Sequence, residues 1–186
     1  EAAIQLRAQG VATAQGLQQT PSLGFVSQLA QNATGSAPYS LALSFRRGVP
    51  ELQVNTTLQG MALNLPAPLG KTADAQQPLR YEQMVARESL VPVAAGATPP
   101  TLRDQVTLDL GSIGSATYLR DLAGPQPRVL RGSMGVGLPA GESAPVVAEG
   151  VAANIRLGRV DVDAWERLLS QSTSASGSAA GGAAGG

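Results

Sequence analysis

The sequence predicts a mainly β protein (β-rich with two short helices), built as a curved antiparallel sheet or meander that either closes over a core or forms an open groove. Apolar and polar residues alternate with a period of two in many stretches, as in strands with one buried face. Turn signals recur about every ten to twenty residues, which favours an antiparallel meander over βαβ units. Because aromatic residues make up only 3% of the 186 residues, we expect one domain packed by Leu, Val and Ala.

The first predicted strands lie in the N-terminal third of the chain. Alternation is clear at 4–9, at 39–45 and at 52–58, where apolar residues occupy every second position. After Gly60 the apolar set changes from even to odd positions, at 61–65, so one strand cannot keep all of these residues on one face. We therefore predict a bulge or tight bend at Gly60.

Further strands are predicted along the rest of the module. The alternation is weak at 79–85 and clear at 106–110, and the segments 114–121 and 127–138 form a predicted pair joined through Gly124-Pro125. The last predicted strand is 147–157, with Val147, Val151, Ala153, Ile155 and Leu157 on the inner face.

Capping signals predict the two helices. Thr20-Pro21 is a suitable N-cap and first-turn pair, and Asp163 can cap a second helix in which Glu166 reaches back as in a capping box. Residues 171–186 contain no large apolar residue and cannot offset the entropy of ordering, so we predict a linker or boundary there and a folded module over 1–170.

Composition removes several classes of function. Without Cys or His, the chain lacks thiolate chemistry, Ser-His machinery and the usual zinc ligands, and we predict no metal and no cofactor. The formal net charge of zero and the scattered Arg residues argue against a nucleic-acid partner. No stretch approaches the roughly 18 to 20 apolar residues of a membrane helix. Because the sequence begins at Glu1 without a signal peptide, we expect an internal piece of a longer protein.

The carboxylates and other polar groups favour structural roles over catalytic ones. Asp161 and Asp163 are explained by helix capping, and Asp104 and Asp109 are predicted to face solvent. Glu149 falls on the apolar side of its strand, so either the register changes there or it lies beyond the edge of the core. Lys71, the single lysine, is predicted to be an ordinary surface residue, and the glycines of 132–137 mark close backbone approach rather than a phosphate site.

The aliphatic strand faces leave two alternatives. A sheet that closes, or that the helices cover, makes this face a plain core, whereas a sheet that stays open makes it an apolar groove for acyl chains. The residues that we predict to line such a groove come from three neighbouring segments of the chain. They are Leu41, Leu43, Phe45, Leu52, Val54, Leu58, Leu63 and Leu65.

The segment 58–71, which reads LQGMALNLPAPLGK, resembles the most recognisable stretch of the YhdP-type AsmA-like bacterial envelope proteins, a bridge-like phospholipid transport family. The similarity continues in 35–45, in Pro78-Leu79-Arg80 and in 159–169, in the same order as in the family. The Ser-Gly-Ala tail departs from the pattern of a continuing β-bridge.

The resemblance implies a periplasmic part of an inner-membrane-anchored protein in a Gram-negative bacterium, in which a long β-sheet curls into a hydrophobic groove. It implies no catalytic residues and partners of two kinds, phospholipid acyl chains and neighbouring modules of the same long chain. The expected function is a non-enzymatic part in moving phospholipids between the inner and outer membranes, which maintains the outer-membrane permeability barrier. The alternative is a purely structural or protein-interaction module with a closed core.

Overall fold

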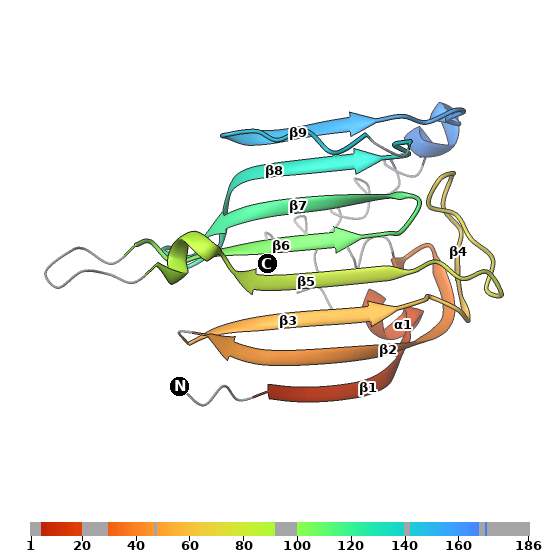
Figure 1. Cartoon of the computed structure of the whole chain (residues 1–186). Helices are drawn as coiled ribbons and strands as arrows, with labels where there is room; N and C mark the ends of the chain where they lie inside the picture. The colour runs from red at the N-terminus through yellow and green to blue at the C-terminus, as the bar shows by residue number, and fades with distance from the viewer. Residues whose placement is uncertain are drawn as a thin grey trace, which may run out of the picture.

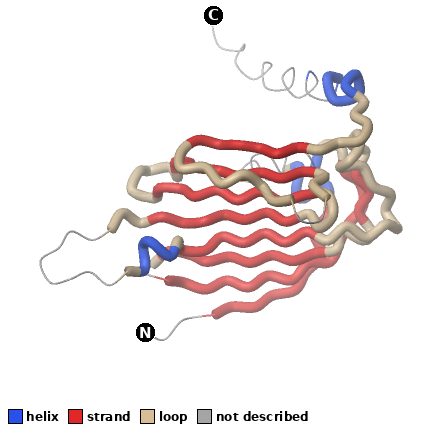
Figure 2. The backbone as a smooth tube through the Cα atoms, turned by 45° about the horizontal axis from the view of Figure 1, so that its top comes forward, coloured by secondary structure: helices blue, strands red, loops and turns tan. Residues whose placement is uncertain are grey.

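A computed structural model describes residues 5–19, 30–46, 48–91, 100–139, 142–167 and 170. The chain forms one curved, open sheet, as Figure 1 and Figure 2 show. Its elements are β1 (Gln5–Thr13), α1 (Ala14–Gln18), β2 (Ala33–Arg46), β3 (Val49–Thr56), β4 (Met61–Leu63), β5 (Leu79–Val85), the 3-10 helix η2 (Arg87–Leu90), β6 (Arg103–Asp109), β7 (Gly114–Asp121), β8 (Arg128–Val136) and β9 (Gly150–Ile155), followed by a helical segment over 162–167.

The strands follow one another across the sheet almost in chain order. The order is β1-β2-β3-β5-β6-β7-β8-β9, so β1 and β9 are the two edges, and β4 lies off this path and pairs with the start of β2. Every pair is antiparallel except β8 and β9, which are parallel. The mainly β fold and the antiparallel pair at 114–121 and 128–136 are thus confirmed, whereas the last strand departs from a meander. The chain leaves β8 at Val136 and enters β9 at Gly150 in the same direction, and a parallel neighbour of this kind requires a crossover connection.

The bend predicted at Gly60 is confirmed. β3 ends at Thr56, and the chain turns through Gly60, whose φ of 96° is in the left-handed region. Residues 61–63 then pair with 33–35 of β2 instead of continuing β3. Gly35 and Gly60 approach so closely that a Cβ built on Gly35 would lie 2.3 Å from the Gly60 carbonyl oxygen.

Lys71 holds this bend and is not the ordinary surface residue that we predicted. Its side chain is partly buried, and Nζ donates hydrogen bonds to the carbonyl oxygens of Leu58, Met61 and Thr72. Burial lowers the pKa of Lys71, and the nearby Asp74 carboxylate opposes that effect. Because its ammonium group donates hydrogen bonds to carbonyl oxygens of the turn, Lys71 stabilises the bend.

The helices differ in detail from the prediction. The segment from Thr20-Pro21 lies outside the described residues, as do 171–186, and α1 precedes both with Thr13 as its N-cap. At the C-terminal helix the cap is Asp161 rather than Asp163, because Asp161 Oδ1 accepts a 2.9 Å hydrogen bond from the amide of Ala164. No helix among the described residues has the length and apolar character that a membrane crossing needs.

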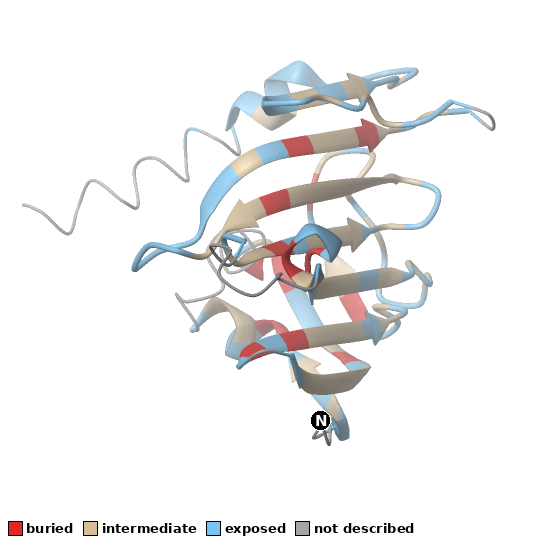
Figure 3. Ribbon diagram, turned by 60° about the vertical axis from the view of Figure 1, so that its left-hand side comes forward, coloured by how far each residue is buried: buried red, intermediate tan, exposed pale blue. Residues whose placement is uncertain are grey.

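Buried apolar side chains gather at one end of the sheet. Ala14 of α1, Ala33 and Ala37 of β2 and Met61 of β4 form a buried group, which we call the end cluster. Leu17, Leu58 and Leu63 pack against it. Elsewhere the buried segments are short and separated by half-buried or exposed ones, as Figure 3 shows.

Candidate apolar ligand face

Pairing register aligns apolar side chains into rows that run across the strands. In one row, each residue is the direct neighbour of the next from β1 to β9. This row is Ala8, Leu41, Val54, Tyr81, Leu108, Ala116, Met134 and Ala153. The next row lies two residues along each strand, and therefore on the same face. It is Leu6, Leu43, Leu52, Gln83, Val106, Tyr118, Gly132 and Val151.

We call these two rows the apolar band. Gln83 is its only polar side chain apart from the two tyrosine hydroxyls. The band crosses seven inter-strand steps, so with a strand spacing of about 4.8 Å it extends about 34 Å from one edge of the sheet to the other. The opposite face of the same strands presents mostly polar side chains, and we call it the polar face. Its members on β2 and β3 include Ser40, Ser44, Gln53 and Asn55.

The larger side chains of the band are not buried. Leu41, Leu43, Leu52 and Val54 are half-buried, and the exposed fraction rises to 56% at Leu6 and 57% at Val151, on the two edge strands. Among the described residues, the largest fully buried side chains are those of Asp104 and Ser89, not of any Leu, Ile or Phe. This sheet therefore carries a continuous aliphatic surface that the described residues leave accessible.

Two tyrosine rings lie over glycines of the neighbouring strand on this face. A Cβ built on Gly10 would lie 2.8 Å from Tyr39 Oη, and one built on Gly132 would lie 2.5 Å from Tyr118 Cδ1. The glycines thus leave room for the rings to lie against the sheet. The close approach predicted for the glycine-rich run is thus observed at Gly132, where the neighbour is a tyrosine ring.

The structure separates the eight predicted groove residues into two groups. Leu41, Leu43, Leu52 and Val54 lie in the band, and Phe45 extends the same face by one row, with 47% of its surface exposed. The other three residues follow the bend at Gly60 or precede it directly. Leu58 and Leu63 pack against the end cluster, and Leu65 is buried with 9% exposed.

A polar network enters the band from one margin. Asp104 Oδ1 and Oδ2 accept hydrogen bonds from Arg120 Nε at 2.9 Å and Nη2 at 2.6 Å. Asp104 Oδ2 also accepts one from Gln83 Nε2 at 2.9 Å, and the Tyr81 hydroxyl donates to Gln83 Oε1 at 3.2 Å. Asp104 and Arg120 form a charged pair in the row next to the band, the row that also contains Phe45 and Val85. Gln83 and Tyr81 connect this pair to the two rows of the band.

Asp104 was predicted to face solvent, and that prediction is wrong. Its exposed fraction is 0%, while the side chain of its partner Arg120 is 23% exposed. The alternation itself carried the signal, because Asp104 has the same parity as Val106 and Leu108, and Arg120 the same parity as Tyr118. Asp109 is exposed, as predicted.

The environment of the network changes two pKa values. The hydrogen bonds with Asp104 raise the pKa of Arg120, so this guanidinium stays charged. Burial raises the pKa of Tyr81, and Arg120 partly opposes that shift. Both effects keep Arg120 charged and the Tyr81 hydroxyl protonated near neutral pH.

Glu51 and Glu149 lie in different surroundings. Glu51, on the polar face, has 6% of its surface exposed and accepts hydrogen bonds from the Val85 amide and from Arg46. Glu149 is exposed and precedes β9, so it lies beyond the strand that it was predicted to interrupt. The described residues contain no group of three or more acidic side chains placed to hold a metal ion.

Two hollows lie over the polar face rather than over the band. Their volumes are about 880 Å³ and 410 Å³, and Gln9, Ser40 and Asn55 line both. The larger hollow also reaches Arg80 and Asp109 at the end of the strands where β4 lies. The band is therefore an open surface, and the hollowed side of β1 to β5 is the polar one.

Comparison of the chain with protein-family models, with curated proteins and with solved structures finds no match.

Proposed function

We propose that this protein is a non-enzymatic β module that presents its apolar band to the acyl chains of phospholipids. The observation that carries the proposal is the accessibility of the band, a two-row aliphatic surface that crosses the whole sheet and has no large buried side chain. Exposed apolar surfaces of this extent are characteristic of sites that bind a partner or a lipid. In this proposal the module belongs to a YhdP-type envelope protein and lies in the periplasm of a Gram-negative bacterium.

The energetics of such a contact are favourable. Each methylene group removed from water contributes about 0.8 kcal/mol, so an acyl chain with on the order of ten methylenes on the band gains several kcal/mol. The gain is offset by the entropy lost on binding, which leaves a reversible interaction. Reversible binding suits a surface along which a lipid passes, because tight binding would retain it.

A protein-interaction role is the second candidate, and the sheet edges favour it. β1 and β9 have a neighbour on one side only, so each presents backbone N–H and C=O groups that another strand can pair with. Under this alternative, a neighbouring module of the same long chain covers the band, and the face serves as a core.

Paired substitutions on the two faces of β2 and β3 separate these candidates. Leu43→Asp with Val54→Asp places two charges on the band, whereas Ala42→Asp with Asn55→Asp places two charges on the polar face of the same strands. Purified protein is mixed with phosphatidylglycerol and examined by native mass spectrometry. We expect lipid on the wild type and on the polar-face variant, and none on the band variant.

Chemical denaturation of the same three proteins completes the test. An open band predicts that both variants still unfold cooperatively, with only the modest loss of unfolding free energy in the band variant that half-buried side chains imply. A loss of several kcal/mol confined to the band variant would instead identify a covered core, because a buried unpaired charge is strongly destabilising. A wild-type protein that takes up no phosphatidylglycerol would overturn the lipid proposal.

A further inference from the structure

The margin of the apolar band that carries Arg120 differs in chemistry from the rest of the face, and the following inference rests on the function proposed above. Along this margin, Asp104 and Arg120 occupy adjacent positions of β6 and β7, one row outside the band. Gln83 and Tyr81 connect them to the two rows of the band. A lipid whose chains lie in the band would therefore meet a hydrogen-bonding group at this margin.

Arg120 retains donors that the network does not use. Its Nε and Nη2 are bound to Asp104, but Nη1 has no acceptor among the described residues. The side chain is 23% exposed, so part of the guanidinium is accessible. Gln83 Nε2 donates to Asp104 and keeps a second hydrogen. The margin thus offers N–H donors beside an aliphatic surface.

The charges of the network select the kind of acceptor. The positive charge of Arg120 is balanced by Asp104, whose carboxylate is fully buried directly beside it. A phosphate at this position would place a second anion near that carboxylate at low dielectric, which is unfavourable. A carbonyl oxygen accepts an N–H without adding charge. The donors therefore suit the ester carbonyl groups of a diacyl lipid better than its phosphate.

The distances across the sheet agree with this placement. From Arg120 on β7 to Leu43 on β2 there are four inter-strand steps, or about 19 Å. One leaflet of a bilayer core, which is the length of an acyl chain, is about 15 Å thick. A lipid held by its esters at Arg120 would thus cover the band as far as β3, three inter-strand steps away.

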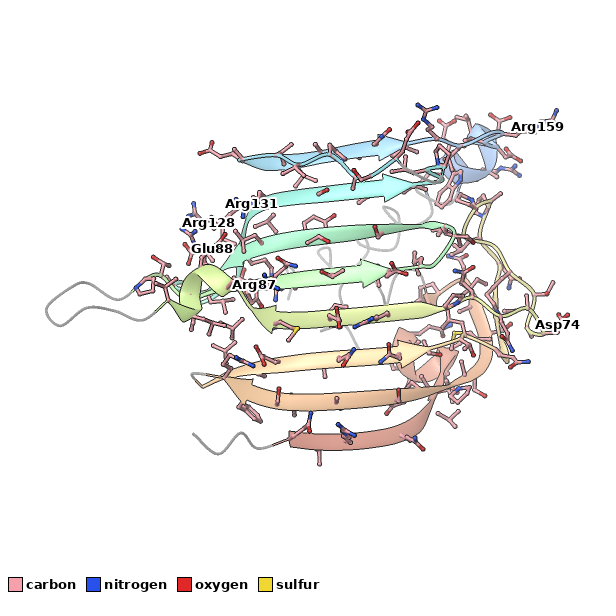
Figure 4. All side chains as sticks on the ribbon, viewed as in Figure 1. Asp74, Arg87, Glu88, Arg128, Arg131 and Arg159 are labelled. Atoms are coloured by element: carbon pink, nitrogen blue, oxygen red, sulfur yellow. The ribbon has the colours of Figure 1, made fainter. Side chains whose placement is uncertain are left out.

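Charged side chains lie at the end of the sheet beyond this margin. Figure 4 shows Arg87, Glu88, Arg128 and Arg131 at the same end of the sheet as the end of β7. Arg131 Nη2 and Glu88 Oε1 are 3.0 Å apart, and the Arg128 side chain is 75% exposed. By register Arg128 and Arg131 belong to the polar face, since they pair with Asp121 and Leu119, so they lie near this margin but outside the band.

We propose that Arg120 and Gln83 bind the ester carbonyl oxygens of a diacyl phospholipid, so that its chains lie along the apolar band and its head group points to the end of the sheet that carries η2. The network is a positioning device for the lipid. It fixes the direction in which every bound lipid lies.

The test compares two forms of phosphatidylglycerol with equal chain lengths, one ester-linked and one ether-linked. The ether lipid keeps the phosphate and the chains but lacks the carbonyl oxygens. For the wild-type protein we expect about tenfold tighter binding of the ester lipid, the effect of one hydrogen bond to a charged donor. The double variant Asp104→Leu with Arg120→Met removes both charges together, and we expect its preference for the ester lipid to fall, with Gln83 as the remaining donor.

The other possible results of these binding measurements lead to different conclusions. Equal binding of both lipids by the wild type would overturn the ester contact and leave the band proposal intact. Binding of neither lipid would overturn the proposed function itself. If the wild type binds both phospholipids equally and diacylglycerol far more weakly, the phosphate is the contacted group and the ester assignment is wrong. Should the double variant fail to fold, Gln83→Met, which removes one donor and no charge, must reduce the preference for the ester lipid.

Discussion

The end cluster and the apolar band contain the same kinds of side chain in very different surroundings. Met61, Ala33 and Ala37 are almost fully buried where α1, β2 and β4 meet. Leu43, a few residues further along β2, is only half-buried. The difference is due to a covering element: α1 contacts β1 and β2 at the end of the sheet, while the centre of the band has no such cover among the described residues.

This difference shows that an apolar strand face is not by itself a core. Period-two alternation reports which side chains share a face, and it is equally strong in both regions. Whether the face is buried depends on a second layer that alternation does not report.

The largest effect on stability is expected at the margin of the band, where the Asp104 side chain is completely buried. Arg120→Met leaves the Asp104 carboxylate buried without its partner and should lower the free energy of unfolding by about 3 to 5 kcal/mol. Adding Asp104→Leu should restore most of that loss, because a buried ion pair is often replaceable by apolar residues. Urea denaturation of both variants measures this. Equal losses in the single and double variants would contradict the pairing.

An intermediate effect is expected from truncation in the two regions. Met61→Ala removes a side chain with 2% of its surface exposed and should cost about 2 to 5 kcal/mol. Leu43→Ala truncates a half-buried side chain and should cost about 1 kcal/mol. Denaturant midpoints of the two variants give the contrast. If both substitutions cost the same, the band is as covered as the end cluster and the comparison fails.

The smallest effect is expected in the titration of Tyr81. Burial raises the pKa of its hydroxyl, so above about pH 10 the unfolded chain releases a proton that the folded protein retains. Stability from this group is therefore present below pH 10 and is lost as the pH rises through the folded-state pKa. The phenolate absorbance of the wild type minus that of Tyr81→Phe isolates this group. If this difference absorbance titrates with the ordinary pKa of tyrosine, Tyr81 is more accessible to water than its burial indicates.

The sequence predicted the strands well because their determinants are local. The alternation at 39–45 and the change of parity at Gly60 correspond to β2 and to the bend before β4. The parallel pairing of β9 was not predicted, because neighbouring strands are antiparallel far more often and no local signal marks a crossover.

The candidate site was predicted in part, for the same physical reason. Leu43 and Val54 were assigned to one face because register is encoded by their spacing. Leu63 was not separated from them, since its contact with the end cluster depends on the path of the chain after Gly60. Asp104 was assigned to solvent from its charge, although its parity placed it beside Val106. Phospholipid binding and the resemblance to YhdP-type proteins remain predictions.

The single tryptophan has a practical consequence. Trp165 Nε1 donates a 3.1 Å hydrogen bond to the carbonyl oxygen of Ala67, which joins the C-terminal helical segment to the loop after β4. Its fluorescence is therefore a built-in reporter of whether these two distant parts of the chain stay docked. Since this contact lies away from the band, the emission provides an independent signal of intact tertiary structure in any lipid titration.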